Sequence, residues 1–251
     1  MSLMQQKDIK KYDLTCIEIC VSGSAPFPTE ALRRWVSMTH ASITEGFGLT
    51  EASPCVTANP LDGPQKEGSI GVAFPHTEIR IVDINDSNHV LGPNEEGEML
   101  VRGPQVMQGY WNRPEETAAT LTDGWLHTGD ICNVDSDGFI YIRGRNKNMI
   151  LGPSGQNIYP EEIEQKLNNL PYVNESIVIE RDGKIIALVH PDYDLAQSQG
   201  LTDDDIKKQM DDNIAALNKE IPAYSQVAAV EIHEEEFEKT PKRSIRRFLY
   251  K

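Results

Sequence analysis

The sequence lacks any apolar run of the roughly 18 residues that a membrane-spanning helix requires. Its first residues also lack the apolar stretch of a secretory signal peptide. We therefore expect a cytoplasmic protein that neither spans a membrane nor is exported. Met1, Ser2 and Leu3 precede a second methionine, Met4, and we interpret them as residues added for expression and leave them out of the fold prediction.

Basic residues are scarce. The 251 residues include 24 Lys and Arg against 39 Asp and Glu, which gives a formal net charge of −15. Nucleic-acid binding needs a basic surface to neutralise phosphates, so we expect no nucleic-acid partner. Six of the last thirteen residues are nevertheless basic. This tail is either a solvated segment or a weak peripheral contact with anionic lipids.

Cysteine is also rare. The four cysteines include no Cys-x-x-Cys pair of the kind that binds metals or carries redox chemistry. Two of them lie an even number of residues apart in a strand-like run, which places them on one face of it. We therefore predict buried thiols rather than a metal or redox site. The four are Cys16, Cys20, Cys55 and Cys132.

Residues 1–63 have the pattern of a parallel α/β sheet. An apolar run at 14–21 predicts a strand, and the loop "SGSAPFP" and a helical pattern through 31–36 follow it. A short strand at 42–45 then leads into "EGFGLTEASP". Ligands of open parallel sheets bind at the carboxyl ends of the strands. We therefore expect both loops just beyond strand ends, in one site.

Residues 64–146 change to short alternating segments such as "EIRIVDI" and "GEMLVRG", punctuated by glycine and proline. The turn "DSDG" joins "ICNV" to "FIYIRG" as a hairpin. This pattern predicts a β-barrel-like subdomain.

Residues 147–251 mix helices and strands. Pro160 begins a helix with three glutamates at its start, Glu161, Glu162 and Glu164. An Asp-Gly turn joins the strands "SIVIE" and "KIIALVH", and a helix after Thr202 precedes the strand "VAAVEIH". The predicted fold class is thus α/β and α+β: the end of a parallel α/β sheet domain with a β-barrel-like subdomain, then a small, mobile α+β C-terminal domain.

Five motifs occur in one order along the chain: "SGSAP", "EGFGLTEASP", "GYWNRPEETAATLTDGWLHTGD", "GRNKNMI" and "GQNIYPEEIE". Their order and spacing resemble those of the AMP-forming acyl-CoA synthetases of the adenylate-forming superfamily, and most of all the bacterial long-chain fatty acid ligases. The resemblance covers nearly the whole chain. It implies a ligase that uses ATP and Mg²⁺ to convert a carboxylic acid to an acyl-adenylate, then passes the acyl group to the thiol of CoA.

Adenylate formation places negative charge on phosphate oxygens, so it needs a cation and fixed donors rather than a protein nucleophile. Glu51 is a hard oxygen ligand suited to Mg²⁺, and the Thr50 hydroxyl can bond a phosphate oxygen. The resemblance assigns them these catalytic roles. It also places Gly46 and Phe47 at the adenine, where the family usually has a tyrosine. A Thr-Glu pair alone is typical of a solvated helix cap.

The remaining nucleoside contacts come from two other motifs. The resemblance places the small residues of the first loop, Ser24, Ala25 and Pro26, near the adenine, where they allow close approach of the backbone. A carboxylate can accept hydrogen bonds from both ribose hydroxyls, and the resemblance gives this role to Asp130 and a second ribose contact to Arg145. Asp130 could alternatively be a turn residue. The neighbouring His127 is expected to pack or support rather than act as a base.

The thiol step involves the third part of the chain. "GRNKN" resembles the interdomain hinge of the family, with Asn148 at the hinge position; asparagine tolerates left-handed backbone conformations. "GPSGQNIYP" resembles the loop along the pantetheine tunnel, which gives Gly155 and Gln156 as CoA contacts. The alternative is an ordinary turn before the helix at Pro160.

The sequence departs from the family pattern in two places. The Ser/Thr/Gly-rich phosphate loop and most of the acyl-binding domain are absent, so the chain resembles the C-terminal part of an enzyme. The family lysine that stabilises the adenylation transition state is replaced by Ser244 in "TPKRSIRR". In an extended strand Lys242 would share a face with Ser244, about 7 Å away. We predict Lys242 as a displaced substitute, with Arg246 as second choice and Arg243 on the opposite face.

The sequence therefore predicts the C-terminal portion of an AMP-forming acyl-CoA synthetase that acts on a fatty acid and is inactive by itself. One alternative is a naturally short nucleotide- or acyl-adenylate-binding protein without catalysis. Another is an adenylating enzyme with a carrier-protein acceptor, or one that performs an oxidation as luciferases do. Acyl chain length is not encoded in the motifs described above.

Overall fold

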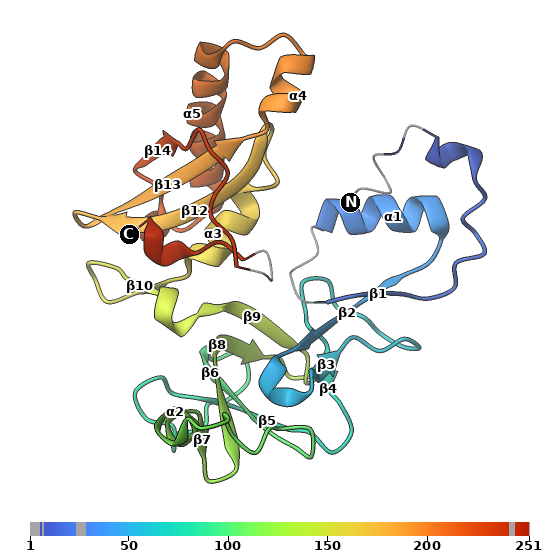
Figure 1. Ribbon diagram of the computed structural model, residues 1–251, viewed down its shortest axis with the longest axis vertical. Helices are drawn as coiled ribbons and strands as arrows, with labels where there is room; N and C mark the ends of the chain where they lie inside the picture. The colour runs from blue at the N-terminus through green and yellow to red at the C-terminus, as the bar shows by residue number, and fades with distance from the viewer. Residues whose placement is uncertain (1–5, 7, 24–28, 241–243, 251) are drawn as a thin grey trace. The chain divides into compact units, whose positions relative to one another are not determined.

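The computed structural model describes residues 6, 8–23, 29–240 and 244–250. These residues form two compact units that divide between Asn146 and Lys147. Each unit contains helices and sheets, so the fold is mixed α/β (Figure 1). Within the described part of the chain, every helix is too short or too polar to cross a bilayer.

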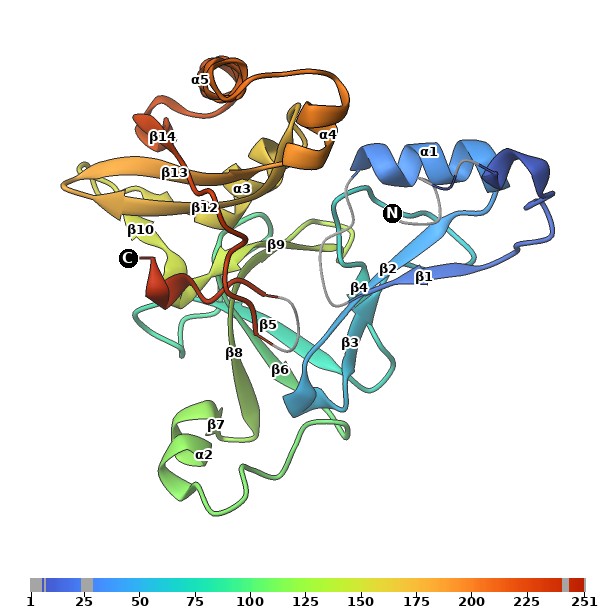
Figure 2. The same ribbon diagram turned by 45° about the horizontal axis from the view of Figure 1, so that its top comes forward.

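The first unit begins with a strand–helix–strand arrangement. The strands β1 (Cys20–Ser22) and β2 (Ile43–Gly48) pair in parallel and are joined through the helix α1 (Thr29–Thr39). Figures 1 and 2 show α1 lying along these two strands. The strands β3 (Cys55–Ala58) and β4 (Val72–Ala73) extend the sheet antiparallel. The parallel strand pair that the sequence predicts is present as β1 and β2, but the sheet as a whole is mixed, because β3 and β4 are antiparallel.

The first strand is shorter than predicted. β1 comprises only residues 20–22, which include just the last two residues of the apolar run, and Ile19 and Val21 are 61% and 72% exposed. The Trp35 indole N–H of α1 donates to the Cys20 sulfur at 3.2 Å, so α1 covers the face of β1 opposite to Val21. A strand continues only where a neighbour accepts its hydrogen bonds, and β2 pairs with just the last two residues of this run and with Ser22 after it.

The prediction that all four thiols are buried was wrong for two of them. Cys16 and Cys55 are exposed, Cys20 is half-buried, and Cys132 is fully buried. Cys16 lies before β1 and Cys55 begins β3, where an adjacent layer does not cover them. Burial raises the pKa of the Cys132 thiol well above its ordinary value.

The first unit also contains an antiparallel five-stranded sheet, in which β9 pairs with β8 and the other strands follow the order β5-β6-β8-β7. Its hairpin β8–β9 is the one predicted from "DSDG". The short helix α2 (Pro114–Thr120) precedes β7. The strands are β5 (Glu78–Val82), β6 (Gly97–Arg102), β7 (Leu121–Thr122), β8 (Trp125–Val134) and β9 (Ile140–Arg145).

One hydrophobic core joins the two sheets of this unit. Met99, Leu126 and Cys132 from the antiparallel sheet pack with Ala52 and Val56 from the segment after β2, and all five are fully buried. The segment that contains Thr50 and Glu51 is therefore anchored on the same core as the strand that carries Asp130.

The second unit is built on the sheet β12-β13-β14. The strands β12 (Val173–Arg181) and β13 (Lys184–Pro191) pair antiparallel through the predicted Asp-Gly turn, and β14 (Ala229–Ile232) pairs in parallel with β13. The helices α3 (Pro160–Leu167) and α5 (Asp203–Glu220) pack on one face of this sheet through a shared apolar core.

The opposite face of this sheet is covered by the C-terminal segment. Phe237, Ile245 and Tyr250 pack against buried isoleucines of β12 and β13. Figures 1 and 2 show this segment, drawn in red, running along the sheet. Smaller elements complete the unit: β10 (Ile150–Leu151), β11 (Asn157–Ile158) and α4 (Tyr193–Ser198). The short 3₁₀ helices of the chain are Ile9–Lys11, Thr50–Ala52, Asn146–Asn148, Ala223–Ser225 and Arg247–Leu249.

Glu164 has a different role from the one its position at the start of α3 suggests. Its side chain is buried, accepts the Val178 N–H at 2.6 Å, and forms an ion pair with Arg247 of the C-terminal segment. It therefore ties that segment to α3 and β12. Burial raises the pKa of Glu164 to about 7, although Arg247 and the Val178 N–H both lower it.

Candidate functional site

The motif "GFG" lies inside β2, not beyond its end as predicted. Gly46 pairs with Ala58 and Phe47 pairs with Thr57 in β3, and the Phe47 ring packs against the core of the first unit. At Gly48 a side chain is impossible, because a Cβ there would lie 2.1 Å from the Pro54 carbonyl oxygen. Only the "LTE" part of the motif therefore projects beyond the strand.

Thr50 and Glu51 lie on a tight turn that follows β2. The Leu49 N–H donates to the Pro54 carbonyl at 2.9 Å, and the 3₁₀ helix between them ends at Ser53, whose φ is 55°. The next residue of this helix, Ala52, is fully buried in the core. The buried alanine fixes the turn so that Thr50 is exposed and Glu51 is half-buried.

Tyr110 contacts the Glu51 carboxylate and was not predicted as a site residue. Its hydroxyl donates to Glu51 Oε1 at 2.8 Å, and the Met107 N–H donates to the Glu51 carbonyl oxygen at 2.7 Å. Burial and the Glu51 carboxylate raise the pKa of Tyr110, so the hydroxyl keeps its proton at neutral pH. In the sequence, Tyr110 could have been noticed as the tyrosine of "GYW" at the start of the third motif.

The residues around Glu51 are compatible with a cation that is held partly by a substrate. Among the described residues, His, Cys, Asp and Glu side chains gather nowhere in groups of three that could hold a metal ion by themselves. Mg²⁺ in nucleotide sites commonly uses one or two carboxylates, with phosphate oxygens and water as its other ligands. A single carboxylate beside an exposed threonine hydroxyl fits that ligand set.

Asp130 is buried in β8 and is paired with Arg145 directly opposite it in β9. Arg145 Nε lies 2.8 Å from Asp130 Oδ1, and the Arg145 Nη1–H donates to the Thr128 carbonyl at 3.1 Å. The Thr128 hydroxyl accepts the Asp130 N–H at 3.1 Å. Asp130 is thus held in a strand by several contacts and is not a turn residue. The Arg145 side chain remains 47% exposed.

His127 lies next to this pair but contacts a different carboxylate. His127 Nδ1 is 3.1 Å from Glu98 Oε2, while Glu98 Oε1 accepts the Gly129 N–H at 3.0 Å. Glu98 therefore joins His127 to the backbone immediately before Asp130, and this arrangement agrees with the supporting role predicted for His127.

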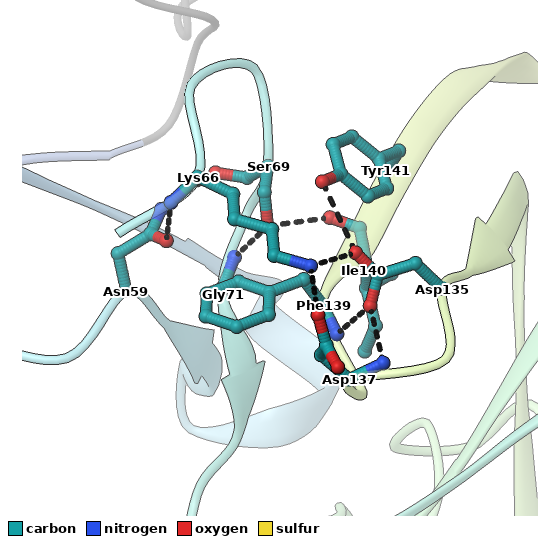
Figure 3. A network of polar contacts seen from close by, with 9 residues as sticks. All are labelled: Asn59, Lys66, Ser69, Gly71, Asp135, Asp137, Phe139, Ile140 and Tyr141. Carbon is teal, nitrogen blue, oxygen red and sulfur yellow. Dashed lines mark hydrogen bonds and ion pairs between the residues drawn. The ribbon is translucent and has the colours of Figure 1, made fainter. Parts of the chain in front are cut away.

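A polar network connects Asn59, which follows β3, to the hairpin that carries Asp130 and Arg145, and Figure 3 shows it from Asn59 onward. It begins at the Asn59 N–H, which donates to the Glu45 carbonyl at 2.8 Å, and the Asn59 amide in turn donates to the Ser69 carbonyl at 2.7 Å. The Ser69 hydroxyl donates to the Ile140 carbonyl of β9 at 3.1 Å. The two sheets of the first unit are therefore joined by hydrogen bonds as well as by the apolar core.

Lys66 is the charged centre of the same network. Its ammonium lies 2.6 Å from carboxylate oxygens of both Asp135 and Asp137 and 4.8 Å from the centre of the Phe139 ring. The two aspartates raise the pKa of Lys66, and Lys66 in turn lowers the pKa of Asp135. Figure 3 shows Lys66 reaching across to the turn between β8 and β9.

The predicted hinge and CoA residues lie at the start of the second unit. Asn148 ends a 3₁₀ helix, and its side-chain amide donates to Glu161 Oε1 at 2.6 Å. It is not among the residues with positive φ, so left-handed backbone does not explain the asparagine here. Gly155 has a φ of 83°, in the turn that joins β10 and β11, and Gln156 follows it.

Several predicted site residues cannot be placed. Ser24, Ala25, Pro26, Lys242 and Arg243 lie outside the described residues.

The described residues on either side of Lys242 and Arg243 contact one another. Lys239 pairs antiparallel with Ile245, and the Thr240 N–H donates to the Ser244 carbonyl at 2.8 Å. The Arg246 guanidinium lies 3.6 Å from Glu238.

Comparison with known families identifies the chain. Residues 1–111 match the model of the AMP-binding enzymes, and residues 147–250 match the model of the AMP-binding enzyme C-terminal domain. The chain belongs to the AMP-binding enzyme family. The resemblance on which the sequence reading was based is thus confirmed at the level of the family.

Individual members of the AMP-binding enzymes support this assignment. A long-chain-fatty-acid–CoA ligase of Bacillus subtilis is 44% identical over 178 residues, which are 71% of this chain and 31% of that protein. The chain thus spans about a third of the length of this curated relative. The structure of an anthranilate CoA ligase in complex with anthranoyl-AMP matches 99% of this chain and 46% of its own, with a TM-score of 0.82 at 27% identity. ATP-bound MatB from Rhodopseudomonas palustris matches 92% of this chain and 44% of its own, with a TM-score of 0.74 at 28% identity.

Proposed function

We propose that the chain supplies the nucleotide, cation and thiol contacts of an AMP-forming acyl-CoA synthetase that acts on a long-chain fatty acid. The family models and the 44% identity to a fatty-acid ligase support the reaction class and the acid. In this proposal residues 1–63 are the end of an α/β adenylation domain, residues 64–146 are a β-barrel-like subdomain, and residues 147–251 are a mobile α+β domain. ATP, CoA and the carboxylic acid are the substrates.

In the first step a carboxylate oxygen of the acid attacks the α-phosphorus of ATP and pyrophosphate leaves. The Thr50 hydroxyl donates a hydrogen bond to a phosphate oxygen. Glu51 would hold Mg²⁺, which would neutralise charge that develops on the phosphates. Gly46 and Phe47 lie against the adenine. Asp130 accepts from the ribose hydroxyls while Arg145 holds its carboxylate and makes the second ribose contact.

In the second step the CoA thiol attacks the acyl carbonyl and AMP leaves. Gly155 and Gln156 contact the pantetheine arm, and Asn148 is the hinge about which the last domain changes position. The positive φ of Gly155 is by itself a structural reason for glycine at this position, in addition to the proposed contact with CoA. A carrier-protein phosphopantetheine presents the same thiol arm, so it is the alternative acceptor.

The observation that carries this proposal is the buried Asp130–Arg145 pair. A carboxylate with 4% residual exposure, fixed by an arginine across two strands, is arranged to accept hydrogen bonds rather than to solvate a surface. AMP binding to the chain, measured by titration calorimetry, tests it. We expect Asp130→Asn to weaken AMP binding about tenfold or more, because hydrogen bonds to a charged group are lost.

The control variant is Asp123→Asn, an exposed aspartate in the turn before β8 that should bind AMP normally. 2′,3′-Dideoxy-AMP provides the matching change in the ligand. It should bind the unsubstituted chain and Asp130→Asn equally weakly if Asp130 acts on the ribose hydroxyls. Normal AMP binding by Asp130→Asn would refute the assignment.

The phosphate-loop motif of the family does not occur in this sequence, so we expect no ATP-dependent CoA ester from the chain alone. Incubation with ATP, Mg²⁺, CoA and oleate, followed by mass spectrometry, checks this expectation. Ester above a control without protein would show that the chain is sufficient.

The second candidate function is nucleotide or acyl-adenylate binding without catalysis. Ser244 favours it, because a serine at the position of the family lysine cannot stabilise phosphate charge. Lys242 is the proposed substitute. In a protein that also contains the phosphate loop, Lys242→Ala should slow ATP–pyrophosphate exchange, and an unchanged rate would favour binding without a lysine-assisted reaction.

A further inference from the structure

One short segment of the first unit holds Glu51 at both its backbone and its side chain. The Met107 N–H fixes the carbonyl of Glu51, and the Tyr110 hydroxyl binds Oε1 of its carboxylate. Within the described residues no other hydrogen-bond donor reaches this carboxylate. Tyr110 therefore selects the orientation of the side chain and occupies one oxygen, while the other is left to a ligand.

Tyr110 is itself held by α2. Its N–H donates to the Thr117 hydroxyl oxygen at 2.9 Å, and that hydroxyl donates to the Arg113 carbonyl at 2.7 Å. Gly109 has a φ of 150°, and a Cβ there would lie 2.7 Å from Thr117 Cγ2. The backbone before Tyr110 thus packs directly on Thr117, and α2 fixes the position of the Tyr110 backbone.

We propose that Tyr110 is the positioning residue for the cation-binding carboxylate of Glu51, and that Thr117 holds Tyr110 in place. This inference rests on the proposed role of Glu51. A glutamate on a half-buried turn has several rotatable bonds, whereas a tyrosine anchored at its backbone has two. Hydrogen bonds that orient a metal ligand typically change metal affinity about 10- to 100-fold when removed.

The chemistry of the pair also explains why the tyrosine hydroxyl is suited to this place. It is a neutral donor, so it orients the carboxylate without the charge by which a lysine or arginine would repel a cation. Glu51 and Tyr110 are 59 positions apart in the chain, so the contact exists only in the folded first unit.

The test uses Mn²⁺ in place of Mg²⁺, with the non-hydrolysable nucleotide α,β-methylene-ATP. Loss of the electron paramagnetic resonance signal of free Mn²⁺ measures binding to the full chain. We expect Tyr110→Phe to weaken Mn²⁺ binding about tenfold, the low end of the range because Tyr110 is 36% exposed. Thr117→Val should give a smaller loss, and Thr117→Ser should restore it.

Two measurements separate positioning from a general structural effect. AMP affinity without a cation should be the same in all these variants, because Tyr110 is not proposed to touch the nucleoside. The matched control is Tyr224→Phe, a 47% exposed tyrosine in the second unit, which should bind Mn²⁺ normally. A parallel loss of AMP and Mn²⁺ affinity in Tyr110→Phe would overturn the inference.

Glu51→Gln distinguishes failure of the inference from failure of the proposed function. If Glu51→Gln loses Mn²⁺ binding and Tyr110→Phe does not, Tyr110 is not a positioning residue and the role of Glu51 stands. If Glu51→Gln binds Mn²⁺ as well as the unsubstituted chain, or if the unsubstituted chain binds none, the role of Glu51 fails and the inference fails with it.

Discussion

The buried Glu164–Arg247 pair predicts an unusual dependence of stability on pH in the second unit. Glu164 joins α3 to the C-terminal segment, and its carboxyl has a pKa of about 7 against an ordinary value of 4.5. Glu164→Gln removes the titration but keeps a side chain of the same size. Its amide oxygen can still accept the Val178 N–H.

The sign follows from proton linkage. Between pH 4.5 and 7 the folded unit keeps a proton on Glu164 that the unfolded chain has lost. Unfolding therefore releases a proton, and the free energy of unfolding falls as the pH rises through this window. The shift of about 2.5 pKa units corresponds to about 3 kcal/mol of lost stability by pH 7.5. Below about pH 3.5 and above about pH 8 this contribution is flat.

The assay must follow the second unit alone. Urea-dependent hydrogen exchange of peptides from β12 and β13, read by mass spectrometry at pH 5 and pH 7.5, does so once intrinsic exchange rates are corrected. All three tryptophans lie within residues 1–146, so tryptophan fluorescence reports the first unit in the same samples. All other ionisable groups are the same in both proteins, so their contributions cancel in the comparison.

We expect the unsubstituted chain to lose about 2 kcal/mol more stability in the second unit between these pH values than Glu164→Gln does, since part of the loss has already occurred by pH 5. The first unit should behave identically in both proteins. Equal pH dependence of β12 and β13 exchange in the two proteins would refute the reasoning, because it would mean that the Glu164 carboxyl does not titrate in this window.

Three further predictions concern the scaffold. Lys66→Met should speed hydrogen exchange at the turn between β8 and β9, because the two aspartates lose their cation, and unchanged exchange there would contradict this. Gly155→Ala should lower the free energy of unfolding by about 1 kcal/mol through backbone strain alone. Gly71→Ala should lower it by more than about 3 kcal/mol. The larger loss is expected because a Cβ at residue 71 would lie 1.9 Å from the Ala58 carbonyl carbon. Urea denaturation measures the stability of both variants, and equal losses would contradict this prediction. Thr202→Ala should lower the stability of the second unit by about 1 kcal/mol through loss of the α5 capping box, measured by circular dichroism against Thr202→Ser, which should lose little.

Signals that act over a few residues were read correctly from the sequence. Pro160 begins α3, the Asp-Gly pair makes the turn between β12 and β13, and Thr202 caps α5. Each depends on local backbone geometry or on a hydrogen bond within one turn, so the residues concerned are close in the chain. The family motifs are of the same kind, because each is a short contiguous segment.

Burial was predicted less well. Only two residues of the apolar run at 14–21 lie in β1, and Cys16 and Cys55 are exposed. An apolar residue is buried only if another layer covers it, and the identity of that layer is not a property of the run itself. The face of β1 that α1 covers was predictable from alternation, but the exposure of Val21 was not.

By itself the sequence determined the family, the order of the elements and the residues of the family motifs, because these depend on local patterns. Tertiary structure alone decided which distant side chains meet. Tyr110 reaches Glu51 across 59 residues, and Arg247 reaches Glu164 across 83. Such pairs depend on sheet register and on the packing of a shared core, where a shift of one residue would move a side chain to the opposite face.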